Sequence, residues 1–379
     1  MYVRCLLLPA LMLVVLGTAA AQEAPDVRRI DPDMAIAAAG DDLQWYDAQL
    51  LGVEGRGWKE VAAPYDRLPS KAEGVVPDPV WSLSHHSAGM AIRFQTNARR
   101  INAKWKLRFE NLAMPHMPAT GVSGVDLYLL DGGAWRWAAG GRPTEFPENS
   151  VELLADAPEG VHEYLLYLPL YNGVEPVLIG IESGAELTTA PARPEASAKP
   201  ILFYGTSITQ GGCASRPGMA YPALIGRRLH RETINLGFSG NGRMEPAMAG
   251  LLGELDPAVY VLDCLPNLKP GESQERVAPF VRALRAARPD TPILLVEHII
   301  YQHGWIDAER GSRYQQNNEN LKAAYQALKD EGISGLHYLP CDALLGDDGE
   351  ATVDGVHPTD LGFHRQAIAI GDALAEILK

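Results

Sequence analysis

The sequence predicts an antiparallel β-sandwich followed by a doubly wound α/β domain. The chain has 379 residues, which is enough for two domains of ordinary size. Short segments of alternating polarity fill the first half, whereas short apolar runs alternate with amphipathic segments in the second half. We therefore expect a sandwich over 22–184, a linker over 185–199 that contains Pro, Ala and Thr, and an α/β domain over 200–379.

The first 21 residues are expected to be a signal peptide. Arg4 precedes an apolar run from Leu6 to Leu16, and small residues lead to an expected cleavage after Ala21. The alternative is a membrane anchor, but the run is too short to cross a bilayer. Cys5 also lies away from the cleavage site, which argues against a lipid anchor. We expect a secreted or periplasmic protein with no membrane anchor after cleavage.

Charge and cysteine content narrow the function classes. The formal net charge is −14 and there is no long run of Lys or Arg, so nucleic acid and a polybasic membrane contact are not expected partners. Cys213, Cys264 and Cys341 remain after the signal peptide, which permits at most one internal disulfide. Cys213 and Cys264 are the first pair to test, and free buried thiols are the alternative. The sequence makes no prediction of oligomeric state.

The first half contains several strand-like segments and little helical periodicity. A turn-forming Asp-Gly-Gly at 131–133 predicts a hairpin. Such frequent short strands are typical of a sandwich, and we expect a jelly roll. The expected strands are 90–96, 101–109, 125–130, 134–137, 162–168 and 177–181.

The second half alternates apolar runs with helical stripes such as Val277, Phe280, Val281 and Leu284. Five such units predict a parallel, doubly wound sheet with right-handed crossovers. In sheets of this kind the ligand site lies at the carboxyl ends of the strands. The expected strands are 201–204, 233–236, 258–262, 293–296 and 335–339.

Candidate catalytic residues follow the first and last of these strands. Ser207 comes just after the first strand, beside Gly205. Asp354 and His357 follow the fifth strand, and their spacing lets a carboxylate reach Nδ1 of the imidazole while Nε2 stays free. The alternatives are that Ser207 caps a helix and that Asp354 belongs to a surface turn.

Two further loops contain possible oxyanion donors. Gly240 follows the second strand and offers a backbone N–H, and Asn267 follows the third strand and offers a side-chain amide. Singly, each is more typical of a turn. Together with Ser207 and the Asp-x-x-His segment, they place one polar group after each of four strands of one sheet.

These segments resemble the four blocks of the SGNH, or GDSL-type, hydrolases. The matching blocks are 205–210, 235–240, 264–267 and 354–357, and 124–128 resembles the Gly-x-Asp-Leu-Tyr signature of a β-sandwich that precedes some of these domains. The chain departs from the family at Thr206, where the family has Asp, and at Leu265, where it has Gly. The resemblance implies a flavodoxin-like five-stranded fold and a serine esterase acting on short acyl groups, often acetyl, on carbohydrates.

The expected mechanism is acyl transfer through Ser207. His357 acts as the base and Asp354 orients it, while the amides of Ser207 and Gly240 and the side chain of Asn267 face the oxyanion. No metal or organic cofactor is required, and a small-molecule or carbohydrate ester is the expected partner. An acyltransferase with the same residues and a sandwich that binds glycans are the alternatives.

Several other residues are weaker candidates. Asp126 and Tyr128 are expected to contribute to the active-site rim, and Glu297 and His298 are possible substrate contacts, although a buried polar pair is the alternative. Arg216 is expected to form a surface ion pair rather than to meet an anionic substrate.

The aromatic and histidine residues of the sandwich and its surroundings suggest two further possibilities. Tryptophans could stack on sugars, but core packing is the favoured interpretation. Histidine pairs could bind a metal, but neither pair has a convincing ligand set. The residues concerned are Trp81, Trp105, Trp135, Trp137, His85, His86, His298 and His303.

Overall fold

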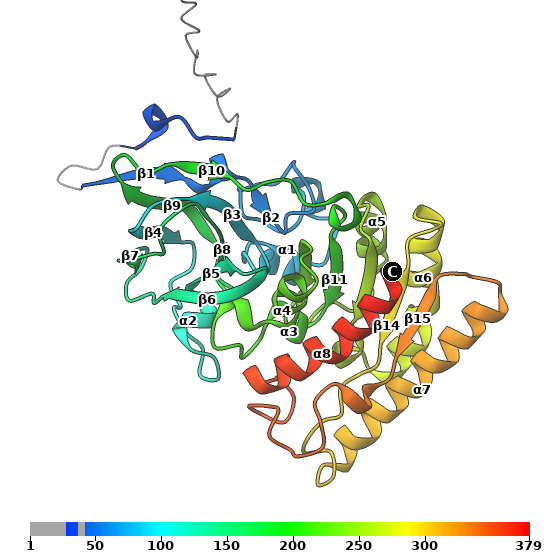
Figure 1. Cartoon of the computed structure of the whole chain (residues 1–379). Coiled ribbons are helices and arrows are strands. Elements are labelled where there is room, and N and C mark those ends of the chain that lie inside the picture. The colour runs from blue at the N-terminus through cyan, green and yellow to red at the C-terminus, as the bar shows by residue number, and fades with distance from the viewer. Residues whose placement is uncertain (1–27, 37–41) are drawn as a thin grey trace, which may run out of the picture.

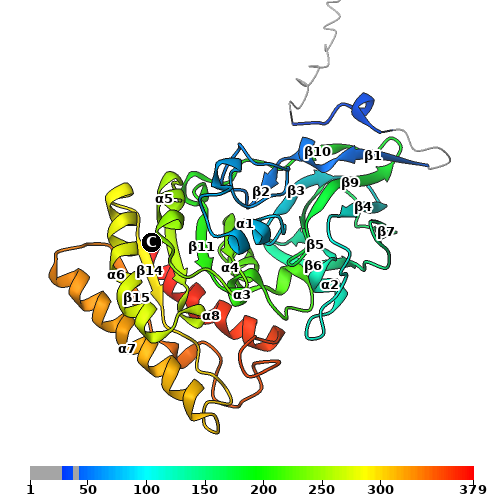
Figure 2. The ribbon, with the colours of Figure 1, turned by 180° about the vertical axis from the view of Figure 1, so that it is seen from behind.

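The structure is a computed structural model that describes residues 28–36 and 42–379. The expected signal peptide lies outside these residues. Figures 1 and 2 show a β-sandwich packed beside an α/β domain, with the C-terminal helix against the parallel sheet. Within the described ranges, no helix is long and apolar enough to cross a membrane.

Two antiparallel sheets form the sandwich, as predicted. The first has the order β1 (Leu43–Asp47), β9 (Val174–Glu182), β4 (Ile101–Leu107) and β7 (Glu148–Leu154). The second has the order β10 (Leu187–Thr189), β3 (Ala91–Thr96), β8 (His162–Tyr167), β5 (Val125–Asp131) and β6 (Ala134–Gly141), with β2 (Val53–Glu54) paired to β3. The expected hairpin joins β5 to β6. Jelly-roll connectivity stays a prediction.

The interior of the sandwich is apolar because alternate residues of each strand face the other sheet. Phe94, Leu127 and Ile179 are completely or almost completely buried there. Trp105 is buried as well, and its indole N–H donates a 2.9 Å hydrogen bond to the Ser123 carbonyl. Burial of such side chains is the main stabilisation of this domain.

The second domain has the predicted five-stranded parallel sheet. Its order is β12 (Thr233–Gly237), β11 (Ile201–Gly205), β13 (Val259–Asp263), β14 (Ile293–Val296) and β15 (Leu336–Leu339). The chain therefore starts at β11, moves to one side and then returns to build the other side, which creates a switch point beside β11. The helices of the chain are α1 (Asp78–Ser84), α2 (Ala119–Val122), α3 (Ser207–Gln210), α4 (Tyr221–Arg228), α5 (Pro246–Glu254), α6 (Pro270–Ala287), α7 (Ala308–Asp330) and α8 (Asp360–Ile377). Short 3₁₀ helices occur at Pro32–Met34, Ala48–Leu51, Ser70–Ala72, Glu195–Ser197, Pro217–Met219, Leu265–Asn267 and Cys341–Ala343.

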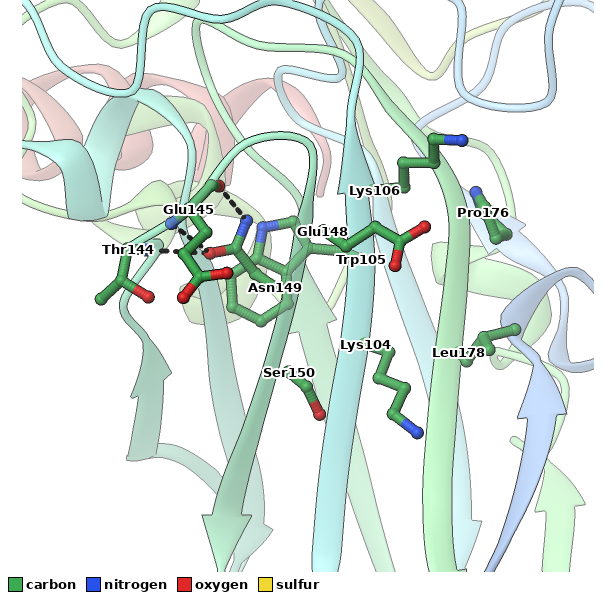
Figure 3. A pocket seen from close by; sticks show the side chains of 10 residues that line it. All are labelled: Lys104, Trp105, Lys106, Thr144, Glu145, Glu148, Asn149, Ser150, Pro176 and Leu178. Carbon is green, nitrogen blue, oxygen red and sulfur yellow. Dashed lines mark hydrogen bonds between the residues drawn. The ribbon is translucent and has the colours of Figure 1, made fainter. Parts of the chain in front are cut away.

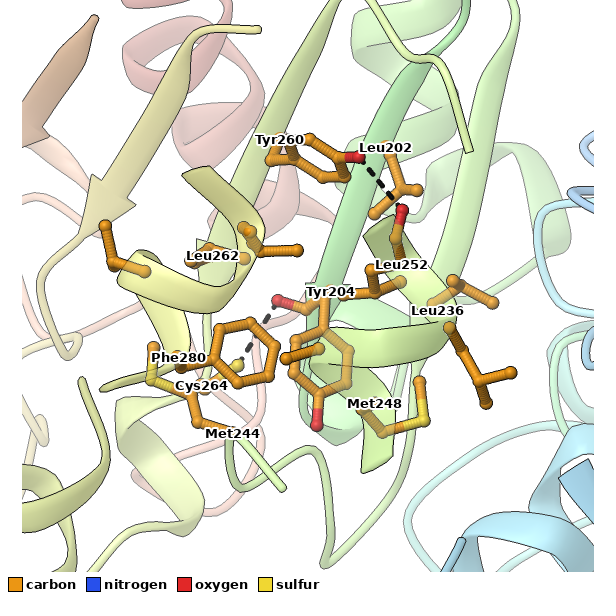
Figure 4. Packing of buried hydrophobic residues seen from close by; sticks show 14 of the residues in the cluster. Leu202, Tyr204, Leu236, Met244, Met248, Leu252, Tyr260, Leu262, Cys264 and Phe280 are labelled. Carbon is orange, nitrogen blue, oxygen red and sulfur yellow. Dashed lines mark hydrogen bonds between the residues drawn. The ribbon is translucent and has the colours of Figure 1, made fainter. Parts of the chain in front are cut away.

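Helices cover both faces of the parallel sheet. Leu202 and Tyr204 of β11 face the side covered by α5 and α6 (Figure 4), whereas Ile201 and Phe203 face the side covered by α4 and α8. Consecutive residues of a strand point to opposite faces, so both must be apolar when both faces are covered. This explains the continuous apolar runs in the sequence.

The boundary between the domains differs from the expected linker. Part of 185–199 forms β10, which pairs with β3 of the sandwich, so this segment is not a structureless connection. Residues before α1 also pack on the α/β domain: Trp58, Leu68 and Val76 belong to the same core as β12. The two domains therefore share a continuous apolar interface.

A buried guanidinium crosses this interface. Arg67 donates hydrogen bonds to the carbonyls of His86 and Leu83 on its own side, at 2.8 and 2.6 Å. It also donates to Asn235 and Gly237 at the end of β12, at 3.3 and 2.6 Å. A buried charge is costly unless its donors are satisfied, and these carbonyls satisfy them.

The cysteines are free. Cys213 and Cys264 are both buried and no disulfide joins them, so the alternative of free thiols holds for this pair. Cys264 lies in the core beneath the parallel sheet, where its Sγ is 3.4 Å from the Tyr204 carbonyl (Figure 4). Burial raises the pKa of the Cys264 thiol well above its ordinary value, which makes it unreactive.

Candidate active site

Ser207 lies at the start of α3, directly after the carboxyl end of β11. A side chain at Gly205 would place its Cβ 2.1 Å from Thr209 Oγ1, so the chain can turn into the helix here only with glycine. The Thr206 hydroxyl accepts the Ile208 amide and caps the helix. Ser207 is only 7% exposed, so the residue is largely shielded from solvent.

The structure brings Ser207, His357 and Asp354 together. The Ser207 Oγ and His357 Nε2 atoms are 2.8 Å apart, and His357 Nδ1 is 2.8 Å from Asp354 Oδ2. The second oxygen of Asp354 accepts the backbone amides of Val356 and His357, at 3.0 and 2.8 Å. One carboxylate thus fixes both the imidazole and the turn that carries it.

These contacts keep Asp354 ionised. Partial burial acts to raise the pKa of its carboxyl, but hydrogen bonds from the His357 ring, the His357 amide and the Val356 amide outweigh burial and lower the pKa below its ordinary value. An ionised carboxylate at Nδ1 leaves Nε2 free to accept a proton from Ser207.

A neighbouring loop supports the turn from outside. Gly355 has a φ of +84°, and a Cβ there would lie 1.7 Å from His303 Nδ1, so the histidine packs directly on the glycine. The Gln302 backbone N–H donates to the Gly355 carbonyl at 3.1 Å, and its side-chain Oε1 accepts the Thr352 hydroxyl at 2.7 Å. His303 therefore supports the turn.

The two expected oxyanion loops contact each other. Gly240 is exposed, and no heavy atom lies within 4 Å of the position a Cβ would take. Asn267 donates one N–H to the Asn241 carbonyl at 2.5 Å, and its amide carries a second N–H. Gln210 of α3 accepts the Ser239 amide at 3.0 Å, which ties the glycine loop to the nucleophile helix.

Asp126 and Tyr128 belong to the domain interface, which corrects their expected place at the rim. Asp126 is fully buried and accepts hydrogen bonds from Arg216 Nη1 at 2.7 Å, the Gly218 amide at 2.9 Å and the Trp137 indole at 2.8 Å. Arg216 also donates to the Tyr128 hydroxyl. The expected surface pair of Arg216 is instead an ion pair with a buried carboxylate.

Glu297 and His298 form internal contacts, so the structure favours the buried polar alternative over substrate contact. Glu297 accepts the Cys341 amide at 2.8 Å and the Tyr338 hydroxyl. His298 is completely buried and its Nδ1 lies 2.5 Å from the Ile299 carbonyl. Burial lowers the pKa of His298 to about 3, so it stays neutral.

The sandwich has its own hollow, separate from Ser207. It has a volume of about 430 Å³ and is lined by polar and charged side chains such as Lys106 and Glu148 (Figure 3). Trp105 borders it but is buried in the core. The exposed Trp137 does not line this hollow, and its indole N–H donates to Asp126 at the domain interface. The hollow therefore offers no exposed aromatic ring for a sugar.

The histidines that were considered as metal ligands contact other protein groups. His85 Nδ1 lies 2.9 Å from Asp66 Oδ2, and His86 Nδ1 accepts from Gln210 at 3.0 Å. Across the described part of the chain, no group of three His, Cys, Asp or Glu side chains could hold a metal ion.

Two residues near the triad were not predicted from the sequence. The ring of His116, from the sandwich, lies 5.9 Å from the His357 ring, centroid to centroid. The Tyr171 hydroxyl donates to the Ser207 carbonyl at 3.2 Å. Neither belongs to a motif, and His116 reaches His357 and Tyr171 reaches Ser207 only because the domains pack together.

Each domain of the chain matches a known protein family. Residues 198–377 match the GDSL-like lipase/acylhydrolase family, and residues 43–187 match the N-terminal domain of SGNH hydrolase-type esterases. No curated protein sequence matches the chain.

Solved structures show the same two-domain arrangement. A GDSL-like lipase from Bacteroides ovatus is 35% identical, with a TM-score of 0.83 over 89% of this chain and 98% of that one. A salicylyl-acyltransferase of a tetracycline biosynthetic pathway is 17% identical, with a TM-score of 0.68 over 90% and 97%. An acetyl xylan esterase from Butyrivibrio proteoclasticus is 12% identical, with a TM-score of 0.54 over 89% and 99%. The chain belongs to the GDSL-like lipase/acylhydrolase family, in its form with an N-terminal sandwich.

Proposed function

We propose that this protein is a serine esterase whose nucleophile is Ser207. The observation that carries the proposal is the continuous contact from the Ser207 hydroxyl through the His357 imidazole to the Asp354 carboxylate, with 2.8 Å at each step. A hydroxyl is a weak nucleophile, and a base within hydrogen-bonding distance is what activates it.

In the first half of the reaction, His357 Nε2 takes the Ser207 proton as Oγ attacks the ester carbonyl. The ester C–O bond then breaks, His357 returns the proton to the departing alcohol, and the acyl group stays on Ser207. In the second half, His357 deprotonates a water molecule, which releases the acid and restores the hydroxyl. Asp354 stabilises the imidazolium in both halves.

The negative oxygen of each tetrahedral intermediate needs hydrogen-bond donors. We assign this role to the Ser207 and Gly240 amides and the Asn267 side chain. Ser207 is the first residue of α3, and a backbone amide at the start of a helix has no carbonyl partner within the helix. The Asn267 side chain has a second N–H beyond the one that the Asn241 carbonyl accepts. Removal of one such donor typically lowers kcat by about 10²–10³.

The proposed substrate is a short acyl ester, preferably acetyl, of a carbohydrate. The shared fold of the acetyl xylan esterase, and of a carbohydrate esterase from Clostridium thermocellum solved in complex with cellohexaose, supports this class. The proposed location is secreted or periplasmic, because the segment from Arg4 to Ala21 has the pattern of a signal peptide.

An acyltransferase is the second candidate. The likeness to the salicylyl-acyltransferase supports it, because the same acyl-enzyme can pass its acyl group to an alcohol instead of water. The ratio of hydrolysis to transfer, measured with an acetyl ester in the presence of sugars, distinguishes the two.

Substitution of the nucleophile tests the proposed function. Ser207→Ala should fold normally and lose roughly 10⁴-fold or more of kcat on acetyl esters. Ser312, which is exposed in α7, provides a matched control, and Ser312→Ala should keep full activity. Retained hydrolysis in Ser207→Ala would overturn the assignment.

A further inference from the structure

His116 stands at the tip of a tight turn that the sandwich extends toward the catalytic centre. Met114 and Met117 exchange both of their backbone hydrogen bonds, each at 3.0 Å, so Pro115 and His116 form a two-residue tip. The His116 side chain is exposed, and its ring lies 5.9 Å from the His357 ring at an interplanar angle of 52°.

The turn is held firmly on the α/β domain. Met117 is buried in the apolar cluster that also contains Ile208 of the nucleophile helix. A Cβ at Gly121 would lie 2.2 Å from the Ala214 carbonyl, so α2 rests directly on the loop after α3. The Thr120 hydroxyl donates to the Ser215 carbonyl at 2.6 Å. The position of His116 is thus fixed by the packing of the two domains.

The reaction requires the alcohol and the carbonyl oxygen of the ester to meet different groups around Ser207. The departing alcohol receives its proton from His357 Nε2, so its oxygen must lie next to that ring. In the proposed mechanism the carbonyl oxygen instead meets the donors of Ser207, Gly240 and Asn267. His116 lies beside His357, so its place corresponds to the alcohol part of this arrangement.

We propose that His116 is a substrate-binding residue that the sandwich contributes to the alcohol subsite, where its imidazole hydrogen-bonds a hydroxyl of the alcohol. This inference rests on the proposed esterase function and deepens it. An imidazole can donate and accept, and no hydrogen bond within the described chain occupies the His116 ring. The matching alcohol is one with hydroxyls near the ester, as in a partly acetylated sugar.

Two acetyl esters with different alcohols provide the test. Acetylated xylo-oligosaccharide and ethyl acetate give the same acetyl-enzyme, so they differ only in the alcohol that leaves. His116→Ala should lower kcat/KM for the oligosaccharide by roughly 3- to 10-fold, which corresponds to one hydrogen bond. Ethyl acetate should be hydrolysed within 2-fold of wild type, because ethanol has no further hydroxyl.

Two variants separate substrate binding from a structural role. His116→Asn keeps an N–H donor and should recover part of the loss on the oligosaccharide. His162, on β8 of the sandwich, is the control histidine, and His162→Ala should change the hydrolysis of neither substrate. Unfolding midpoints of all variants should match wild type.

The outcomes distinguish the inference from the function it rests on. An equal loss on both esters, or no loss on either, would overturn the role of His116 and leave the esterase function intact. Hydrolysis of ethyl acetate but not of the oligosaccharide by the wild type would also overturn it. Absence of hydrolysis of any acetyl ester by the wild type would overturn both.

Discussion

The α/β domain and the sandwich contribute to the candidate site through different kinds of contact. The α/β domain supplies Ser207 from the start of α3, and Asp354 and His357 from the turn before α8. The sandwich side of the molecule supplies buried polar contacts to other segments of that domain, from Arg67 to the end of β12 and from Asp126 to Arg216 in the loop after α3. This difference indicates that catalysis and the integrity of the interface can be altered separately.

The largest expected effect concerns the catalytic edge. Asp354→Asn should lower kcat by about 10³- to 10⁴-fold, because an amide does not hold Nδ1 of His357 or stabilise the imidazolium as a carboxylate does. Stability should change little, since the Asp354 side chain is 41% exposed. Steady-state kinetics with an acetyl ester measures this. A loss of less than 10-fold would show that Asp354 does not orient the base.

An intermediate effect is expected at the interface. Asp126→Asn should lower the free energy of unfolding by about 3 kcal/mol, because it leaves Arg216 without its buried partner. The kcat of the folded enzyme should stay near wild type. Urea unfolding measures the change.

An exposed ion pair provides the control for Asp126. Asp372 pairs with Arg228, and both side chains are well exposed. Asp372→Asn should cost only about 0.5 kcal/mol. Equal losses of unfolding free energy in the two variants would mean that the buried ion pair of Asp126 stabilises the fold no more than an exposed pair does.

The smallest effect concerns the pH dependence of stability, which we expect to depend on Glu232, another residue of the domain interface. Glu232 Oε1 accepts the Gly55 amide at 2.7 Å, and burial, with the nearby charge of Glu54, raises the pKa of Glu232 to about 7. The folded state thus binds this proton more tightly than the unfolded state, where the pKa is about 4.5. Stability from this group is present below about pH 4.5 and is lost as pH rises toward 7.

Glu232→Gln should remove this dependence while keeping an oxygen for the Gly55 amide. Between pH 5 and 7 the variant should lose less stability than wild type, by roughly 2 kcal/mol. Urea unfolding at pH 5, 6 and 7 provides the comparison. Identical slopes for the two proteins would contradict a raised pKa at Glu232.

Sequence patterns predicted what depends on short stretches of chain. The five apolar runs became parallel strands because both faces of that sheet are covered, and the carboxyl-end rule then located Ser207, His357, Gly240 and Asn267. The contact between Asp354 and His357 could also be predicted, because the two residues are only three positions apart in the sequence.

Contacts between distant segments were not predictable in the same way. Arg67 reaches Asn235 across 168 positions, and Asp126 reaches Arg216 across 90. An Asp near a rim has the same local sequence whether it faces substrate or an arginine, so Asp126 was placed wrongly. His116 had no local signal at all, since only domain packing brings it to His357.

Covalent labelling of the nucleophile tests the central claim most directly. A fluorophosphonate forms a bond with an activated serine hydroxyl and expels fluoride, and mass spectrometry of peptides locates the adduct. We predict one adduct, on Ser207, that forms far more slowly in His357→Ala because the base at 2.8 Å is gone. No adduct, or an adduct on another serine, would contradict the account.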